Sequence, residues 1–290
     1  MPKTSPVILI TGAACGIGKA LALSLVQSGY TVYGAAPRLE DLDAFVAAGG
    51  HPLQMNVCNE TAMILAVRMI ECEHGAIDVL INNTNYTIYG AVEDVPLEEA
   101  RRQFELNFFG LARLTQLAMP AMRERNTGRI VNISVMGGSS HFPLGAWYHS
   151  SKQAFTSWSD CLRLELAPMG IKVITVEPGI LKTELVAQDL GPRSSKTSLL
   201  AELMGDLTDQ QVQPSPYHGK TRALVAAMEQ GHAIDSFACF AVLIEVIHQA
   251  ITARWPKHYY FASRTAQPVK FAMRWLGERR YDNLITASTK

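Results

Sequence analysis

The sequence predicts an α/β fold in which a doubly wound parallel sheet forms a single domain. Short, β-rich apolar runs alternate with helical patterns from Val7 to Pro178, and such alternation implies right-handed crossovers with helices on both faces of the sheet. A glycine-rich turn separates the first apolar run from the first helix. The chain has 290 residues, of which 48% are hydrophobic and 18% charged, so it has enough apolar material for one large core.

The expected strands are short runs that end at turns. The first, Val7 to Thr11, is apolar without a break, which predicts a strand buried on both faces. Asn59 is expected to cap the third helix, and a bend is expected near Phe109 and Gly110. The expected strands are 7–11, 31–36, 51–57, 77–83, 128–134 and 171–179, and the expected helices of this part are 17–29, 38–50, 59–74, 98–122 and 147–169.

Beyond Pro178 the alternation weakens, and residues 186–219 are rich in Ser, Gln, Gly and Pro. Helical patterns resume at 221, at 236–254 and at 269–276. We therefore expect a single domain, 1–290, with a nucleotide-binding and catalytic core at 5–185 and a substrate loop with C-terminal helices at 186–290. The last helix, with basic residues nearby, is expected to cap the substrate pocket or contact another subunit; a membrane-surface role is the alternative.

Composition and short motifs argue against several classes of protein. The formal net charge is zero, so no bulk field recruits nucleic acid or an anionic membrane. The five cysteines form no C-x-x-C pair and the histidines no H-E-x-x-H motif, so we expect no metal site, no disulfide framework and a reducing, cytoplasmic location. The N-terminus does not read as a signal peptide, and no stretch approaches the ~18 apolar residues of a membrane span.

The first turn, "TGAACGIG", predicts a nucleotide site of the Rossmann type. Gly12, Gly16 and Gly18 lie between a buried strand and a helix. Glycines there allow a tight turn and let backbone amides approach a pyrophosphate at the helix N-terminus. Cys15 and Ile17 fall in the same turn, and we interpret Cys15 as a small loop filler. A turn that simply needs glycine is the alternative.

The end of the second strand bears on the choice of cofactor. An acidic residue there would accept a hydrogen bond from a ribose 2′-hydroxyl and favour NAD. This chain has Ala36, Pro37 and Arg38 instead. The missing acid removes a repulsion, and Arg38 can pair with a 2′-phosphate, so NADP(H) is the expected cofactor with NAD(H) not excluded. A solvated charge at the helix start is the other interpretation of Arg38.

Tyr148 and Lys152, in "YHSSK", lie four residues apart within an expected helix. Positions i and i+4 share one helix face, so a phenol and an ammonium point into the same space. The spacing alone does not separate a catalytic pair from a tyrosine packed on a lysine stem.

Several motifs in order carry a resemblance to the short-chain dehydrogenase/reductase family over about residues 5 to 185. They are "TGAACGIG", "NFFG", "YHSSK" and "EPG". The segments 86–111 and 147–168 look most like the retinol- and hydroxysteroid-dehydrogenase-like branch. The resemblance implies that the cofactor is also contacted by Asn56, Val57, Asn83, Thr84, Asn85, Pro178, Gly179, Ile180 and Thr183.

The same resemblance implies catalytic roles. Tyr148 donates a proton to a carbonyl oxygen while hydride arrives from the nicotinamide. A free tyrosine has a pKa of about 10, and the Lys152 ammonium would favour its phenolate. Lys152 would also hold the nicotinamide ribose hydroxyls, and Asn107 would anchor a water that joins Lys152 to solvent.

The chain departs from the family pattern at two places. Where the family has Asn-Asn-Ala-Gly, this chain has "NNTN". Asn85 replaces the glycine, and because Asn tolerates the left-handed conformation better than other side chains, the turn is expected to survive. Thr84 adds bulk beside the cofactor.

The second departure concerns the family's active-site serine, which donates to the substrate oxygen. In "NISVMGG" the expected position is Val135, and Ser134 comes one residue early, on the opposite side of a strand. Losing such a donor typically raises a barrier by ~2.7–4 kcal/mol. Ser134 is kept as a candidate because a bulge can re-aim it. Otherwise Ser139, Ser140 or a backbone amide substitutes, or the enzyme is slow or inactive.

Together these features predict an NADP-dependent oxidoreductase that interconverts a carbonyl and an alcohol on a fairly apolar small molecule. The main alternative is a nucleotide-binding regulatory or scaffold protein that has lost efficient catalysis, and an epimerase or dehydratase is a third. A homodimer is expected from the resemblance and from the apolar surface of the 147–169 helix.

Overall fold

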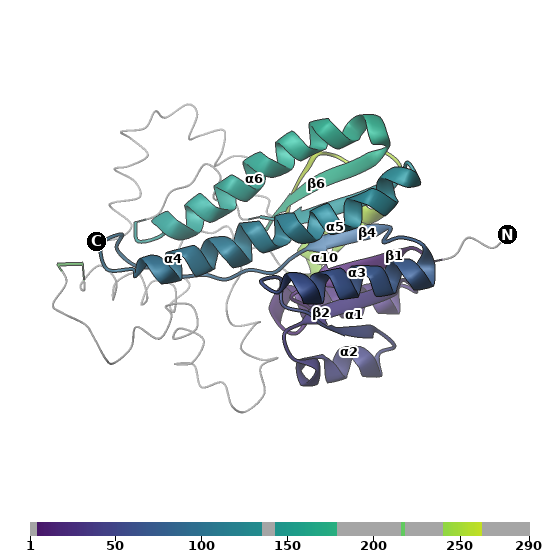
Figure 1. Cartoon of the computed structure of the whole chain (residues 1–290), viewed down its shortest axis with the longest axis horizontal. Helices are drawn as coiled ribbons and strands as arrows, with labels where there is room; N and C mark the ends of the chain where they lie inside the picture. Colours follow the sequence, from purple (N-terminus) through teal and green to yellow (C-terminus); the bar gives the residue numbers. More distant parts are fainter. Residues whose placement is uncertain (1–4, 135–142, 179–215, 218–239, 263–290) are drawn as a thin grey trace.

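The structure is a computed structural model that describes residues 5–134, 143–178, 216–217 and 240–262. Its strands form one seven-stranded sheet in the order β3-β2-β1-β4-β5-β6-β7 (Figure 1). Every neighbouring pair is parallel, so the predicted doubly wound parallel sheet is confirmed. The strands are β1 (Val7–Thr11), β2 (Thr31–Ala36), β3 (His51–Gln54), β4 (Val79–Asn82), β5 (Gly128–Ile133), β6 (Ile171–Glu177) and β7 (Tyr259–Phe261).

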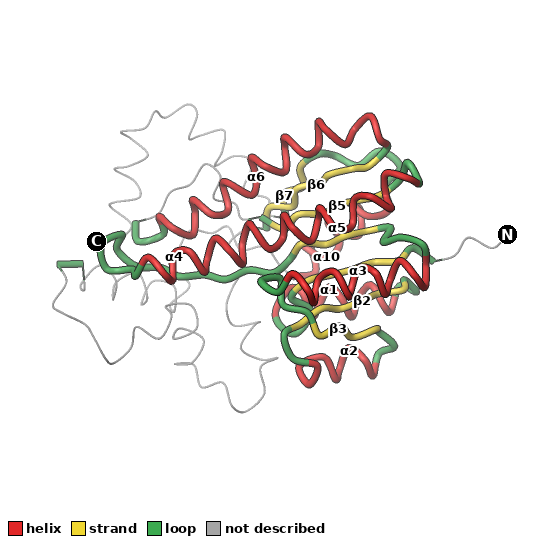
Figure 2. Tube along the Cα trace, viewed as in Figure 1, coloured by secondary structure: helices red, strands yellow, loops and turns green. Residues whose placement is uncertain are grey.

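Helices cover both faces of this sheet (Figure 2). α1, α2 and α10 contribute to the apolar cluster on one face, and α3, α5 and α6 contribute to the cluster on the other. The helices are α1 (Gly16–Gln27), α2 (Asp43–Ala47), α3 (Glu60–His74), α4 (Leu97–Phe104), α5 (Gly110–Glu124), α6 (Ala146–Leu166) and α10 (Phe240–Thr252).

β1 shows why an unbroken apolar run forms a central strand. Ile8 and Ile10 lie in the cluster with α1, whereas Val7 and Leu9 lie in the cluster with α3 and α5. Successive side chains of a strand point to opposite faces, so both sets must be apolar when helices cover both faces. All five residues are buried, as predicted.

The connection between α4 and α5 is a π-helical turn, Glu105–Phe109. The expected bend near Phe109 and Gly110 therefore takes the form of one wider turn, and Asn107 within it is fully buried. A Cβ at Gly110 would collide with the carbonyl oxygen of Val57. Glycine thus lets the start of α5 approach the segment that follows β3.

Several boundaries differ from the prediction. The 38–50 helix consists of a 3₁₀ turn, Leu39–Leu42, and the short α2, and Gly49 with a φ of 96° follows it. Such a left-handed glycine cannot continue a helix. The strands predicted at 51–57 and 77–83 are shorter, whereas the Asn59 cap is confirmed because its side chain accepts a hydrogen bond from Ala62 N at 3.0 Å.

Part of the stretch predicted as a substrate-covering extension belongs to the sheet and its helices. α10 lies against the sheet in the cluster with α1, and β7 pairs with β6. A three-residue strand gives no periodic signal, which explains why β7 was not predicted. The helical patterns at 221 and 269–276 lie outside the described residues. Within the described residues, none of the helices combines the length and the apolar character that a bilayer crossing requires.

Candidate active site

The glycine turn between β1 and α1 has a shape that side chains would prevent. Gly12 and Gly16 have φ values of 67° and 52°, in the region that favours glycine. A Cβ at Gly18 would collide with the carbonyl oxygen of Gly12. Cys15 is the exposed N-cap residue of α1, and the first turn of this helix carries no acidic side chain. This arrangement fits a pyrophosphate at the helix N-terminus.

The segment after β4 holds the glycine turn in place. Thr11 Oγ1 accepts hydrogen bonds from the backbone amides of Asn83 and Thr84 at 3.0 and 2.9 Å. The Asn83 side chain donates to the carbonyl oxygen of Thr11 at 3.0 Å. Asn83 and Thr84 were predicted to contact the cofactor, and the structure places them on the turn that would hold it.

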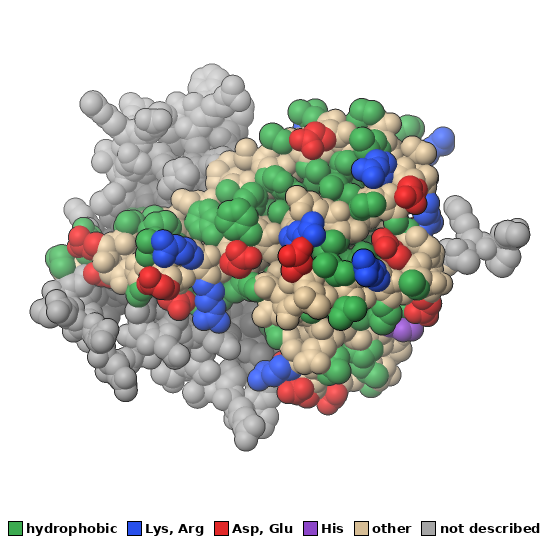
Figure 3. All heavy atoms as spheres, viewed as in Figure 1, with side chains coloured by type: hydrophobic (Ala, Val, Ile, Leu, Met, Phe, Trp, Pro, Cys, Tyr) green, Lys and Arg blue, Asp and Glu red, His purple; other side chains and the backbone are tan. Residues whose placement is uncertain are grey.

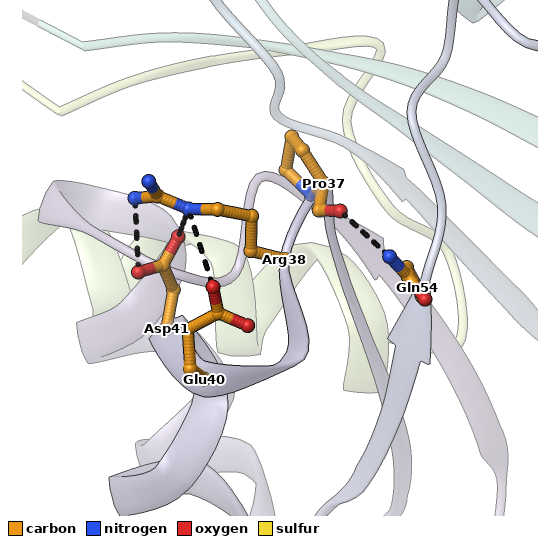
Figure 4. Close-up of polar contacts among 5 residues, drawn as sticks. All are labelled: Pro37, Arg38, Glu40, Asp41 and Gln54. Carbon is orange, nitrogen blue, oxygen red and sulfur yellow. Dashed lines mark hydrogen bonds and ion pairs between the residues drawn. The ribbon is translucent and has the colours of Figure 1, made fainter.

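Arg38, the predicted partner of a 2′-phosphate, forms ion pairs with its own neighbours (Figure 4). Its Nε and Nη2 donate to the two carboxylate oxygens of Asp41 at 2.9 and 3.1 Å, and Glu40 lies at 4.0 Å. The Arg38 side chain is 68% exposed. A 2′-phosphate at this place would therefore share the guanidinium with Asp41 or displace it.

The other predicted cofactor contacts have diverse surroundings. Asn56 Oδ1 accepts a hydrogen bond from Cys58 N at 3.0 Å, so one acceptor site of this oxygen is used within its own turn. Val57 is buried, and Pro178 is buried directly after β6. Gly179, Ile180 and Thr183 lie outside the described residues.

Tyr148 and Lys152 lie one turn apart on the buried side of α6, with exposed fractions of 8% and 3%. Burial raises the pKa of Tyr148 to about 12, because a phenolate loses its hydration there; hydrogen bonds from Thr87 and Asn85 act in the opposite direction. Burial lowers the pKa of Lys152 to about 7. Near neutral pH the phenol is therefore protonated, and the amine exchanges between its two forms.

Asn107 joins the π-helical turn to the segment after β4. Its Oδ1 accepts from the Tyr86 amide at 2.7 Å, and its Nδ2 donates to the Tyr86 carbonyl oxygen at 2.7 Å and to Ser151 Oγ at 3.1 Å. The side chain thus fastens Tyr86 to α6. Both hydrogens of the Asn107 amide are used in these bonds, so a water between Asn107 and Lys152, as the resemblance implies, would donate to Oδ1 or contact the main chain of Asn107.

Asn85 does not adopt the left-handed conformation that was expected where it replaces a glycine. The residues with positive φ in the described part of the chain are Asn126, Leu144 and six glycines. The backbone at this position therefore does not require glycine. The Asn85 Nδ2 donates to Thr87 Oγ1 at 2.9 Å, and both side chains counteract the rise that burial causes in the pKa of Tyr148.

Ser134 directly follows β5, and its side chain points toward α6. Its hydroxyl and that of Thr156 are 2.7 Å apart, and its backbone amide donates to Val176 O at 2.9 Å. Thr156 follows Tyr148 by two helical turns, about 12 Å along the axis. The structure therefore places Ser134 with Thr156 rather than with the Tyr148 hydroxyl, and Val135 lies outside the described residues.

Sequence reasoning missed two residues of this site, Gln103 and Thr87. Gln103 is fully buried, and its Oε1 accepts from the Ile88 amide at 2.7 Å. Gln103 lies four residues before Asn107, so on a helix the two amide side chains share one face. This spacing could have indicated that both point toward the core. Thr87 follows Asn85 by two residues, which in an extended segment places both on one side.

Comparisons with known proteins agree with this geometry. The family model described as short chain dehydrogenase matches residues 6–192. The chain belongs to the short-chain dehydrogenase/reductase family. A solved short-chain dehydrogenase from Streptomyces avermitilis is 29% identical, with a TM-score of 0.76 over 94% of this chain and 93% of its own. The predicted family and its dehydrogenase/reductase class are thereby confirmed.

Two further relatives of this short-chain dehydrogenase/reductase carry informative descriptions. The 3-ketodihydrosphingosine reductase of Bacteroides thetaiotaomicron is 38% identical over 177 residues, which are 61% of this chain and 64% of that reductase. A metagenomic short-chain oxidoreductase solved in complex with NADP is 29% identical, with a TM-score of 0.57 over 61% of this chain and 83% of its own. The match thus spans less than two thirds of the reductase's length.

Proposed function

We propose that this protein is an NADP-dependent oxidoreductase that interconverts a carbonyl and an alcohol on a fairly apolar small molecule. The observation that carries the proposal is the loop Asn83–Thr87. At one end Asn83 is bonded to the glycine turn, and at the other Thr87 acts on the Tyr148 hydroxyl, whose pKa it lowers against the effect of burial. A nucleotide turn and a buried phenol with a lysine on the same helix face are thus joined by five residues.

In the reductive direction Tyr148 is the proton donor. The bound dinucleotide would supply the hydride, and the glycine turn, Arg38 and Lys152 would hold it. The Tyr148 O–H bond breaks and its proton moves to the carbonyl oxygen of the substrate. A pKa of about 12 keeps this phenol protonated at neutral pH, so its resting form is the acid. Oxidation needs the phenolate, which the protonated form of Lys152 favours.

The main test is NADPH consumption with a panel of ketones of increasing chain length. Tyr148→Phe should abolish turnover and leave NADPH affinity nearly unchanged, because the ring remains and only the O–H is lost. A wild-type protein that binds NADPH but reduces no ketone supports the alternative, a nucleotide-binding regulatory or scaffold protein. Turnover that survives in Tyr148→Phe means that another group donates the proton.

The preference for NADP is supported by the absence of an acid at the end of β2 and by Arg38. The NADP complex of the metagenomic relative agrees with it. NADPH should bind more tightly than NADH, and Arg38→Ala should reduce the difference because it removes the cation that pairs with the 2′-phosphate. Isothermal titration with both cofactors measures this, and equal affinities in the wild type would contradict it.

An apolar substrate is supported by the name of the Bacteroides relative, a 3-ketodihydrosphingosine reductase. The retinol- and hydroxysteroid-dehydrogenase-like branch and the cytoplasmic location stay predictions.

The homodimer is supported by apolar side chains on the face formed by α5 and α6 (Figure 3). Phe109 is 55% exposed there, next to Phe108, whose ring lies 6.2 Å from that of Trp158. Light scattering at micromolar concentration should give the mass of a dimer.

A further inference from the structure

The segment that follows β4 is fixed to its surroundings through alternate residues. Asn107 bonds both backbone groups of Tyr86, Gln103 accepts from the amide of Ile88, and the Gly90 amide donates to the Leu144 carbonyl oxygen at 2.8 Å. Both anchoring side chains, Asn107 and Gln103, are fully buried. The positions of the residues between these anchors are therefore set by the core.

The residues that alternate with these anchored positions are the ones that bear on Tyr148. Tyr89 packs its ring against the Tyr148 ring, with 5.5 Å between centroids. Asn85 and Thr87, which are bonded to each other at 2.9 Å, both favour the ionised form of Tyr148 against the effect of burial. Alternation along an extended segment explains this arrangement, because residues 85, 87 and 89 share one side when 86, 88 and 90 share the other.

The pair can donate to a phenolate. Thr87 Oγ1 accepts the Asn85 amide hydrogen at 2.9 Å, and a hydroxyl that accepts one hydrogen bond still has its own proton to donate. The Asn85 amide has two hydrogens, and the one that is not bonded to Thr87 can also be donated to a phenolate. Donors linked in this way polarise one another and strengthen the bond to a negative acceptor.

The sequence leaves a role open at this place. Val135 stands where the family resemblance predicts the active-site serine, and the Ser134 hydroxyl contacts Thr156. Asn85 stands where the family has glycine, although the backbone there has a negative φ. The side chain of Asn85, rather than its backbone, is therefore what distinguishes this chain.

We propose that Asn85 and Thr87 are positioning residues for Tyr148, which hold its hydroxyl and stabilise the phenolate in place of the missing serine. This inference rests on the proposed function, because it assigns Tyr148 the proton transfer. As the Tyr148 proton moves to the substrate oxygen, negative charge develops on the phenolic oxygen. Thr87 and Asn85 donate hydrogen bonds to that charge and keep their own protons.

The test is the pH profile of kcat/KM for alcohol oxidation at saturating NADP⁺, where the cationic nicotinamide and the Lys152 ammonium favour the phenolate. The rising limb of this profile reports the titration of the coupled Tyr148–Lys152 pair. Thr87→Val keeps the shape and removes the hydroxyl, so the limb should move to higher pH by about half to one unit, as expected for one lost hydrogen bond. Asn85→Gly should move it in the same direction. Thr87→Ser retains a hydroxyl and should restore the wild-type limb.

Thr252→Val is the matched control, because Thr252 is an exposed residue of α10 whose hydroxyl bonds the His248 carbonyl oxygen. It should leave the limb unchanged. Melting temperatures and NADPH affinity of all variants should match the wild type, which separates positioning from misfolding.

If the rising limb of both Thr87→Val and Asn85→Gly lies at the same pH as that of the wild type, the inference is wrong. In that case a Tyr148→Phe variant without turnover still leaves the proposed function intact. Should Thr87→Ser shift the limb as far as Thr87→Val, packing rather than the hydroxyl matters, and the inference is again wrong. A wild-type protein without turnover overturns both proposals, and this result is visible before any variant is made.

Discussion

The two ends of the candidate site are built by different means. At the nucleotide end, the shape of the turn comes from absent side chains: positive φ at Gly12 and Gly16, and a close approach at Gly18. At the catalytic end, the shape comes from buried amides, since Asn107 and Gln103 bond the backbone of Tyr86 and Ile88. The nucleotide end depends on backbone conformations that need glycine, which Thr11 and Asn83 support, whereas the catalytic end depends on buried side-chain amides.

This difference determines how each end responds to change. A glycine that is in contact with backbone leaves no soft neighbour that can move, so an added methyl group forces the turn itself to shift. An amide that is lost leaves buried polar groups without partners, which affects stability and positioning together. The nucleotide end should therefore fail through cofactor affinity, and the catalytic end through turnover and melting temperature.

The largest effect is expected from Gly18→Ala. Its Cβ would collide with the Gly12 carbonyl oxygen, and overpacking against rigid backbone typically costs about 1–3 kcal/mol. NADPH affinity should fall by about ten- to hundredfold, measured by fluorescence titration. Gly16→Ala is the control, because its Cβ meets nothing within 4 Å and only the φ of 52° is strained. Equal effects of the two variants would contradict the steric explanation.

A smaller effect is expected from Asn107→Leu, which keeps the volume and removes three hydrogen bonds. Each buried group left without a partner costs about 1–3 kcal/mol, which corresponds to roughly 2–4 °C per kcal/mol in a domain of this size class. We expect a melting temperature lower by at least about 5 °C and a fall in kcat, with little change in NADPH affinity. Gln116→Leu, an exposed amide on α5, is the control. If Asn107→Leu lowers NADPH affinity as much as it lowers kcat, the nucleotide end and the catalytic end do not respond independently.

The smallest effect concerns the pH dependence of stability in the protein without cofactor. Burial lowers the pKa of Lys152 from 10.5 to about 7 in the folded state. Between these values the unfolded chain binds more protons, so the stability of the wild type should rise with pH. Lys152→Met removes this contribution. Urea unfolding at pH 7, 8 and 9 should show that the free energy of unfolding rises more steeply with pH in the wild type than in Lys152→Met. These pH values lie below the titration of Tyr148. Parallel curves would contradict the burial of an uncompensated amine.

The same contrast explains how far the sequence could predict the structure. The glycine turn, the buried strands and the Tyr148–Lys152 face follow from residue type and spacing, and the structure places them as predicted. The bonds of Asn107 to Tyr86 and the contact of Ser134 with Thr156 depend on how segments distant in sequence meet. The periodicity of a sequence cannot predict such long-range contacts. Even the conformation of Asn85 was misjudged, because a glycine in relatives suggested a left-handed turn that this backbone does not adopt.

β7 and α10 have a consequence for how such a chain diversifies. β6 ends at Glu177, α10 begins at Phe240, and the Ala262 amide returns to the Glu177 carbonyl oxygen at 3.1 Å. The stretch between β6 and α10 is therefore bounded by a strand of the sheet and by a helix that packs against the sheet. The entropy of closing a flexible loop grows only logarithmically, by about 0.6 kcal/mol for each doubling of length. Insertions and deletions there carry a small thermodynamic penalty, so the stretch that the sequence predicts to cover the substrate can be exchanged in evolution while the cofactor turn and Tyr148 stay in place.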